Sequence, residues 1–323
     1  MEILINNEKL DFKLEKEKNV GDIIKDLENC VLENGNVIES ISVDNRIIPY
    51  DYSSFEFRQN ISEVNELKII TANQIELAVN TMVTVGEYIN KLLDEYIRID
   101  SLKYYDAILE GLKLIHEGTL DSLRILNIKS MVVVEKEGRT FADILLEMGN
   151  LILKYEKKYI DEDGINILKP LLESLLYTIP KVFKWAVVKN YSMFSTLEKT
   201  RIISYLKMTF ADLYIICYSS VNKFEDIGRN LQLGEDRNAL NDLFYLTELL
   251  DEVISVLRIT KLLLPMLLSD DNCDGIFQEM TNQLKDIERA FKDGDMITVG
   301  DILEYEVRPL FEKLLDLLKK LKI

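Results

Sequence analysis

The segment from Asp270 to Gly275 has the residue types of a calcium-binding loop between two helices. Asp270, Asn272 and Asp274 stand at positions one, three and five, where such loops place oxygen ligands, and glycine follows at position six. The twelfth position, which normally supplies a bidentate glutamate, is Thr281. The pattern therefore favours an ordinary acidic turn in which Asp274 caps the next helix. A weak calcium site with Asp270, Asn272 and Asp274 as metal ligands is the alternative.

The common catalytic and cofactor patterns are missing from the sequence. His116 is the only histidine, and it precedes Gly118 at the predicted end of a helix, where a cationic side chain is favourable. No nucleophile motif accompanies it, so we predict a structural role. The three cysteines form no Cys-x-x-Cys pair and the glycines form no phosphate-binding loop, so no zinc site and no cofactor is predicted. Cys217 lies in an apolar run and is expected in the core.

The charge balance argues against nucleic acid as a partner. The chain has 39 basic and 56 acidic residues, a formal net charge of −17, which repels phosphate backbones and anionic lipid surfaces. Lys181, Lys184 and Lys189 surround Trp185, and we expect these lysines on solvated helix faces.

Membrane insertion and export are not predicted either. The best uncharged apolar run, Leu262–Leu268, is too short to cross a bilayer. The N-terminus lacks the basic start and apolar stretch of a signal peptide. An odd number of scattered cysteines fits a reducing compartment, so we predict a cytoplasmic protein.

The spacing of apolar residues along the chain changes near Thr71–Asn73. Before that point, short apolar runs alternate as in strands, and after it apolar residues recur every three or four positions. The sequence therefore predicts an α+β protein with two domains. Residues 1–72 form a small β-containing domain and residues 73–323 a large all-α helical bundle.

The first domain is predicted as strand, strand, helix, strands and a final strand. The expected strands are Glu2–Asn6, Lys9–Leu14, Val37–Val43, Arg46–Ile48, Phe55–Arg58 and Glu66–Thr71, with a helix over Val20–Glu33 that ends at Asn34-Gly35. This order resembles the ubiquitin-like β-grasp superfamily. Carriers and modifiers of that superfamily use a free C-terminal Gly-Gly, whereas this chain continues into a helix. The resemblance therefore implies a docking module.

The second domain is predicted as long amphipathic helices. Segments near 101–117, 119–130, 140–160, 165–189 and 196–225 have helical periodicity, and a helix near 243–267 is apolar on two sides, which is typical of a central helix. Pro265 and Pro309 should kink or divide their helices. Lys129–Glu137 is rich in β-branched residues but is predicted helical, because an isolated strand would lack a partner.

A short pattern recurs at Asn19, Thr84, Thr140 and Thr298, each followed three residues later by an acid. Such spacing is typical of a capping box, so helices are predicted to start at the copies at 19, 140 and 298. The alternative is an internal duplication, because Met82–Glu87 and Met296–Asp301 are similar at all six positions.

These observations predict a non-enzymatic, cytoplasmic protein that binds other proteins as an adaptor, scaffold or assembly factor. By analogy of class it could serve a bacterial secretion or motility system. The alternatives are a weak calcium-binding helical protein, or an enzyme or small-ligand binder with a pocket between the two domains. Trp185, Tyr191 and His116 would be the first candidates in such a pocket. The partner and the oligomeric state do not follow from the sequence.

Overall fold

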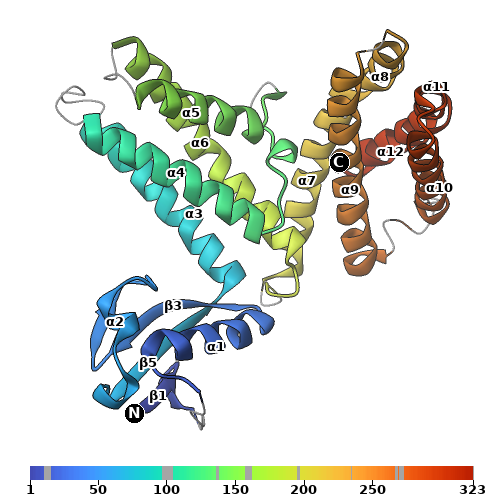
Figure 1. The fold of residues 1–323 in the computed structure, drawn as a ribbon. Coiled ribbons are helices and arrows are strands. Elements are labelled where there is room, and N and C mark those ends of the chain that lie inside the picture. The colour runs from blue at the N-terminus through green and yellow to red at the C-terminus, as the bar shows by residue number, and fades with distance from the viewer. Residues whose placement is uncertain are drawn as a thin grey trace. The chain divides into compact units, whose positions relative to one another are not determined.

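The computed structural model of the chain describes residues 1–10, 16–96, 105–135, 138–156, 162–194, 197–233, 235–265, 268 and 273–322. A five-stranded sheet within residues 2–73 precedes a body of helices (Figure 1). The predicted fold class, α+β with a helical body, is confirmed. The chain divides into two compact units, Met1–Asn80 and Thr81–Ile323.

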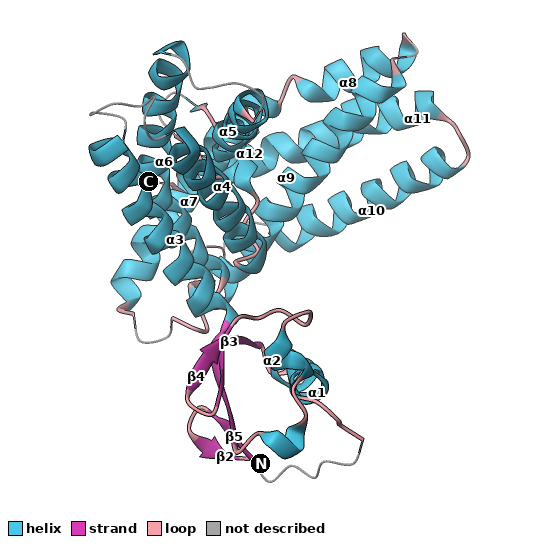
Figure 2. Ribbon diagram, turned by 60° about the vertical axis from the view of Figure 1, so that its left-hand side comes forward, coloured by secondary structure: helices cyan, strands magenta, loops and turns pink. Residues whose placement is uncertain are grey.

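The sheet of the first unit is mixed (Figure 2). Its strands are β1 (Glu2–Ile5), β2 (Glu8–Lys9), β3 (Asn36–Val43), β4 (Arg46–Ile48) and β5 (Glu66–Asn73). They lie in the order β2-β1-β5-β3-β4, with β1 and β5 parallel and the other neighbours antiparallel. Asn6-Asn7 and Asp44-Asn45 turn the two hairpins with positive φ at every position, as two-residue hairpin turns require.

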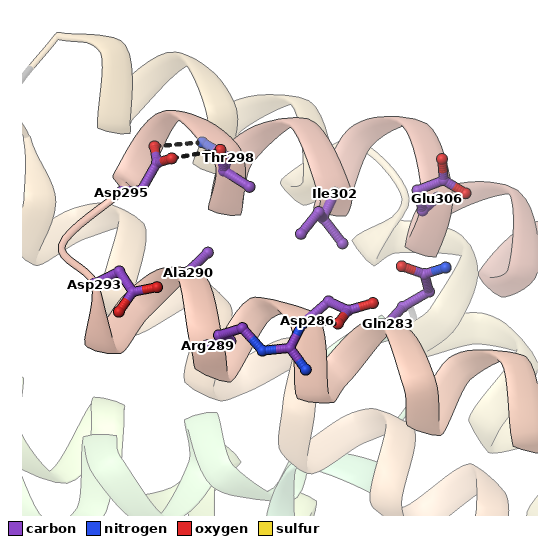
Figure 3. Close-up of a pocket in the computed structure, with 9 residues that line it drawn as sticks. All are labelled: Gln283, Asp286, Arg289, Ala290, Asp293, Asp295, Thr298, Ile302 and Glu306. Atoms are coloured by element: carbon purple, nitrogen blue, oxygen red, sulfur yellow. Dashed lines mark hydrogen bonds and ion pairs between the residues drawn. The ribbon is translucent and has the colours of Figure 1, made fainter.

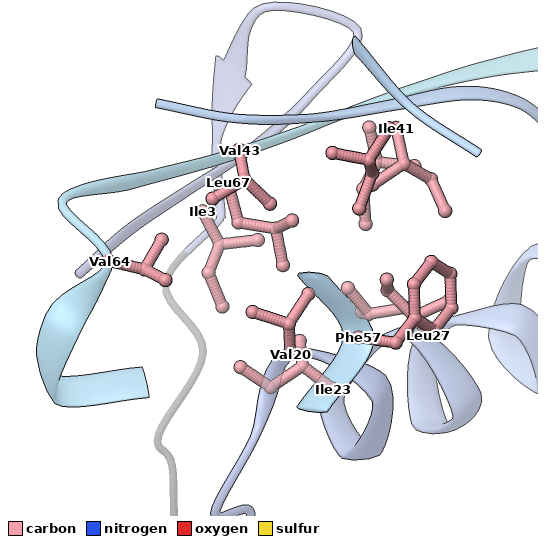
Figure 4. Packing of buried hydrophobic residues seen from close by; sticks show 12 residues of the cluster. Ile3, Val20, Ile23, Leu27, Ile41, Val43, Phe57, Val64 and Leu67 are labelled. Carbon is pink, nitrogen blue, oxygen red and sulfur yellow. The ribbon is translucent and has the colours of Figure 1, made fainter. Parts of the chain in front are cut away.

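The first unit also contains the helices α1 (Val20–Glu33) and α2 (Phe55–Arg58) and the short 3-10 helix η1 (Ile61–Glu63). Buried side chains of α1 pack with those of the sheet in one apolar cluster, which also contains Phe57 (Figure 4). The α1 bounds match the prediction, and Gly35 follows the helix with φ of +71°. The strand predicted over Phe55–Arg58 is wrong, because the Ser54 side chain accepts a hydrogen bond from the Phe57 N–H and starts a helical turn there.

The second unit is helical. Its elements are α3 (Gln74–Lys91, which begins in the first unit), η2 (Leu92–Tyr96), α4 (Tyr105–Ile125), η4 (Ser130–Val132), α5 (Phe141–Tyr155), α6 (Glu162–Lys189), α7 (Lys199–Ser220), α8 (Lys223–Gln232), α9 (Asp236–Leu263), α10 (Cys273–Lys292), α11 (Met296–Asp301), η7 (Ile302–Val307) and α12 (Arg308–Leu321). Helices α4 to α7 pack in sequence order, α9 packs on α6, α7 and α8, and α10 packs on α11 and α12. None of the helices in the described part of the chain is long and apolar enough to cross a membrane.

The predicted break at Gly118 is wrong. Helix α4 continues through this residue, so His116 lies within the helix and not at its end. A Cβ at Gly118 would lie 3.5 Å from side-chain carbons of both Thr81 and Val85. A Cβ would make only ordinary van der Waals contacts there, so Gly118 lies against α3 and does not end the helix.

The helix predicted over Lys129–Glu137 is present only as one turn in the described residues of that segment. A single turn, η4, is followed by extended backbone in which Val134 bridges Thr140. The Glu135 N–H donates to the Arg139 carbonyl at 2.7 Å. The extended segment thus finds its partner only a few residues later, which the sequence prediction did not consider.

The proline predictions agree with the helix boundaries. Helix α9 ends at Leu263, two residues before Pro265. Pro309 lies at the start of α12, directly after the wide π-helical turn η7. A proline lacks the N–H that would bond to the carbonyl four residues earlier, and a π turn changes the bonding partners at that point.

Two of the three predicted helix starts are confirmed. Asn19 and Thr140 each form a complete capping box with the acid three residues on. At Thr298 the prediction is wrong, because α11 starts at Met296 with Asp295 as its cap. Thr84 lies inside α3.

We expect Thr140→Ala to lower the free energy of unfolding of the helical unit by about 1 kcal/mol, because it removes the side chain that caps α5. Urea denaturation followed by circular dichroism measures this loss. Thr281→Ala is the control, because Thr281 is exposed within α10 and bonds only to the Phe277 carbonyl. An equal loss in both variants would contradict the capping assignment.

Candidate protein-docking groove

A polar stripe on α6 holds α9, one of the two helices that line the candidate site. Lys181, Trp185 and Lys189 are four residues apart and therefore share one face of the helix. Trp185 is fully buried, and only 4% of the Lys189 side chain is exposed. The prediction that these lysines lie on solvated faces is wrong for Lys189 and for Lys181, whose side chain is 21% exposed.

The Lys189 ammonium makes a buried ion pair with α9. Its Nζ lies 2.8 Å from Oε2 of Glu252 and donates to Oγ of Ser255 at 3.1 Å. Burial raises the pKa of the Glu252 carboxyl, and the Lys189 charge opposes this rise. Lys129, which precedes η4, pairs with Glu248 of α9 at 3.0 Å. These contacts join α9 to α6 and to the segment that follows α4.

Asp212 of α7 binds the other two side chains of the stripe, Trp185 and Lys181. The Trp185 Nε1–H donates to its Oδ2 at 3.2 Å, and Lys181 Nζ lies 3.2 Å from its Oδ1. Lys181 also donates to the Val134 carbonyl at 2.5 Å. Burial raises the pKa of Asp212, and the Lys181 charge opposes the rise. One face of α6 thus holds α7, α9 and the 130–135 segment.

On another side of α9, an apolar groove separates it from α10. We call this the α9–α10 groove; its volume is about 370 Å³ and its lining residues are Leu240, Leu243, Phe244, Thr247, Leu284, Ile287, Glu288, Phe291 and Lys292. The Phe244 side chain is 66% exposed although it is a large aromatic. Glu288 and Lys292 are the charged members, and they pair with each other at 2.6 Å. An apolar floor with charges at the rim is suited to an amphipathic helix.

The opposite flank of α10 is acidic. There, Gln283, Asp286, Arg289 and Asp293 face Asp295, Thr298, Ile302 and Glu306 across a polar pocket of about 580 Å³ (Figure 3). Asp286 pairs with Arg289 at 3.1 Å, and Asp295 accepts hydrogen bonds from Thr298. Nowhere in the described ranges do three histidine, cysteine or acidic side chains gather closely enough to hold a metal ion. Helix α10 therefore presents an apolar flank toward α9 and an acidic one toward α11.

The calcium loop lies mostly outside the described residues. Asp270 and Asn272 are outside them, whereas Asp274 is exposed in the first turn of α10 and lies 2.5 Å from Lys261 Nζ. Its predicted role as a helix cap is wrong, because α10 already includes Cys273. Calcium binding at Asp270, Asn272 and Asp274 stays a prediction.

The residues predicted for an alternative pocket lie on different elements. His116 of α4 is half-buried, with Nε2 3.5 Å from where a Cβ at Gly149 of α5 would stand. Trp185 instead contacts Asp212, and Tyr191 is half-buried in the turn after α6. Cys217 is buried in α7 as predicted, and burial raises the pKa of its thiol.

Sequence reasoning missed the groove. The sequence predicts α9 as a central helix with two apolar stripes, but Leu240 and Phe244 form a further apolar surface on its N-terminal half. The available signal was the matching series Leu284, Ile287 and Phe291 on α10, at the spacing of one helix face.

Two family models match parts of the chain. The TP0873 N-terminal domain matches residues 1–73, which contain the whole sheet. A domain of unknown function (DUF8042) matches residues 217–317, which contain the groove and the acidic pocket. No curated protein and no solved structure matches the chain. Residues 217–317 contain 21 acidic and 10 basic residues, so most of the excess negative charge belongs to this segment.

We expect Lys189→Met to lower the free energy of unfolding by roughly 3–5 kcal/mol, because it leaves the buried Glu252 carboxylate without its partner. Without the ammonium, the pKa of Glu252 should rise further. The folded state then binds this proton more tightly than the unfolded state, so stability increases as the pH falls toward the ordinary glutamate value of about 4.3. Urea denaturation across a pH series measures both effects.

The double variant Lys189→Met/Glu252→Leu is the matched control. It replaces both charges with apolar groups, so it should recover most of the lost stability and the added pH dependence should vanish. A single variant as stable as the wild type at every pH would contradict the role given to this pair.

Proposed function

We propose that the protein is a non-enzymatic adaptor, scaffold or assembly factor that binds an amphipathic helix of a partner protein in the α9–α10 groove. The observation that carries this proposal is the groove itself, whose floor is apolar and whose two charged residues neutralise each other at the rim. Exposed apolar surface rimmed by polar residues commonly marks a protein interaction site.

The spacing of the lining residues supports a helical occupant. Leu240, Leu243 and Phe244 line the groove from α9, and Leu284, Ile287 and Phe291 line it from α10. A helix laid between these two sets of side chains inserts its own side chains at three- and four-residue spacing. Phe244 is the expected anchor, because aromatic residues contribute most of the binding energy in many interfaces.

The charge of the surrounding segment favours a cationic partner helix. Residues 217–317 carry about twice as many acids as bases, and the acidic pocket lies on the other flank of α10. Opposite charge speeds association and rejects anionic competitors, although it adds less to the affinity itself. The apolar stripe of the partner would supply affinity, and its lysines and arginines would supply selectivity.

The first unit is proposed as a second docking module of β-grasp type. Its strand order, with β1 and β5 parallel and central, supports that resemblance. Strand β5 leads directly into α3, so the sheet ends without the free tail on which carriers and modifiers depend. A cytoplasmic location and an accessory role in a bacterial secretion or motility system stay predictions from the sequence.

We expect Phe244→Asp to abolish capture of the helical partner, because it places a charge in the apolar groove. The tagged chain is used to retain proteins from its native host, and each retained protein is quantified by mass spectrometry for the wild type and the variant. Partner binding that depends on the groove should fall at least tenfold.

Leu146→Asp is the matched control. Leu146 is 67% exposed on α5 and lies outside the groove lining, so the same charge enters at an equally exposed apolar site. If no retained protein distinguishes the two variants, the groove is not the docking surface. Circular dichroism melts of both variants establish that the fold is kept.

A further inference from the structure

One residue of the sheet presents its backbone groups to an open edge. Strand β4 pairs with β3, and none of the strands in the described residues lies on its other side. Val43 and Arg46 close the two-residue turn at Asp44-Asn45, and such a closing pair is hydrogen-bonded. Antiparallel pairs alternate, so the next pair, Ser42 with Ile47, is not hydrogen-bonded. The N–H and carbonyl of Ile47 therefore point away from β3, toward the open edge.

The same edge carries the two most exposed large apolar side chains of the described residues. Ile47 is 81% exposed and Phe55 is 78% exposed. Both line a hollow of about 500 Å³ between β4 and α2, the β4–α2 hollow, together with the core residues Val43 and Ile48. Because side chains alternate along a strand and Ile48 is buried in the core, Ile47 lies on the opposite face of the sheet.

We propose that the β4 edge binds an extended segment of a partner protein as a sixth strand. The residue opposite Ile47 exchanges both backbone hydrogen bonds with it, and its side chain covers Ile47 on the same face. The next residue of the segment points to the other face, beside Phe55 in the hollow. The ligand is thus an extended segment with two adjacent apolar residues. This site belongs to the first unit and is independent of the α9–α10 groove.

Pro49 restricts the site to one register. It has no N–H to offer, and its carbonyl already accepts the Asp51 N–H at 2.9 Å. Ile47 is therefore the single residue of β4 that offers both groups, which also protects the edge against continued sheet growth.

A separate extended segment suits the hollow better than a second copy of this chain. A copy would have to bring its own folded sheet edge and its own α2 into the same space. Two copies also repel each other, because each carries a net charge of −17. A single extended strand brings side chains on both faces without these obstacles.

The test uses a phage-displayed library of random dodecapeptides, selected on the full chain. Enriched peptides are synthesised and titrated by fluorescence anisotropy. We expect them to share two adjacent apolar residues. Ile47→Pro, which removes the N–H but suits an edge strand, should weaken binding about tenfold or more, and Ile47→Val should retain it. N-methylation of the peptide residue that pairs with Ile47 should weaken binding to the same extent.

Two further variants separate this site from its alternatives. Phe55→Ser leaves the backbone edge intact but should weaken binding, and Phe244→Asp should leave binding unchanged because it alters only the α9–α10 groove. Equal thermal melts for all variants establish that the first unit stays folded.

Three results would overturn the proposal. One is that no peptide is enriched. Another is that enriched peptides bind equally well after Ile47→Pro and after N-methylation, which would show that strand pairing is not used. The third is concentration-dependent self-association of the wild type, seen by analytical ultracentrifugation and lost in Ile47→Pro. That result would make a second copy the occupant.

Discussion

The arrangement of the helical unit depends on one buried ion pair, between Lys189 of α6 and Glu252 of α9. Both side chains are withdrawn from water, so each needs the other to offset the cost of burial. Because a charged pair tolerates little displacement, it fixes the position of α9 along α6 more tightly than aliphatic contacts alone would. Lys181 and Trp185 act in the same way on Asp212 of α7. A short stripe of polar side chains thus determines where the surrounding apolar helices lie.

The position of α9 matters for the proposed function because this helix has two tasks, binding to α6 and lining the groove. Its Glu252 and Ser255 bind to α6, while Leu240 and Phe244, about two to four turns earlier, line the α9–α10 groove. The first task is internal and charged, and the second is external and apolar. Helix α10 is divided in a similar way between the groove and the acidic pocket (Figure 3). A groove built on helices that are held elsewhere can keep its shape before a partner arrives, which lowers the entropic cost of binding.

Local signals in the sequence predicted the fold class and many boundaries. These signals involve residues that are close together in the sequence, so the sequence alone reveals them. Examples are the change of periodicity near residue 73, the capping pair at Asn19 and the glycine at 35. The candidate site was missed because it depends on distant partners. A lysine at 189 looks like a solvated residue until Glu252, 63 positions away, is placed beside it. The strand prediction at Phe55–Arg58 failed for a different reason. The Ser54 hydroxyl accepts a hydrogen bond that starts a helical turn, and this outweighs the strand propensity of the aromatic residues.

The π-helical turn η7 has a consequence for how the chain can change in length. It joins α11, which packs on α8, to α12, which packs on α7. A π turn holds one residue more than an α turn, and each residue of a helix advances the facing direction by about 100°. Loss of one residue here would restore regular α-helical winding and leave the faces of α12 nearly unchanged, because five residues of a π turn cover about the same rotation as four residues of an α turn. A single-residue deletion should therefore be tolerated better in η7 than in α12, where it would turn every later side chain by about 100° relative to α7.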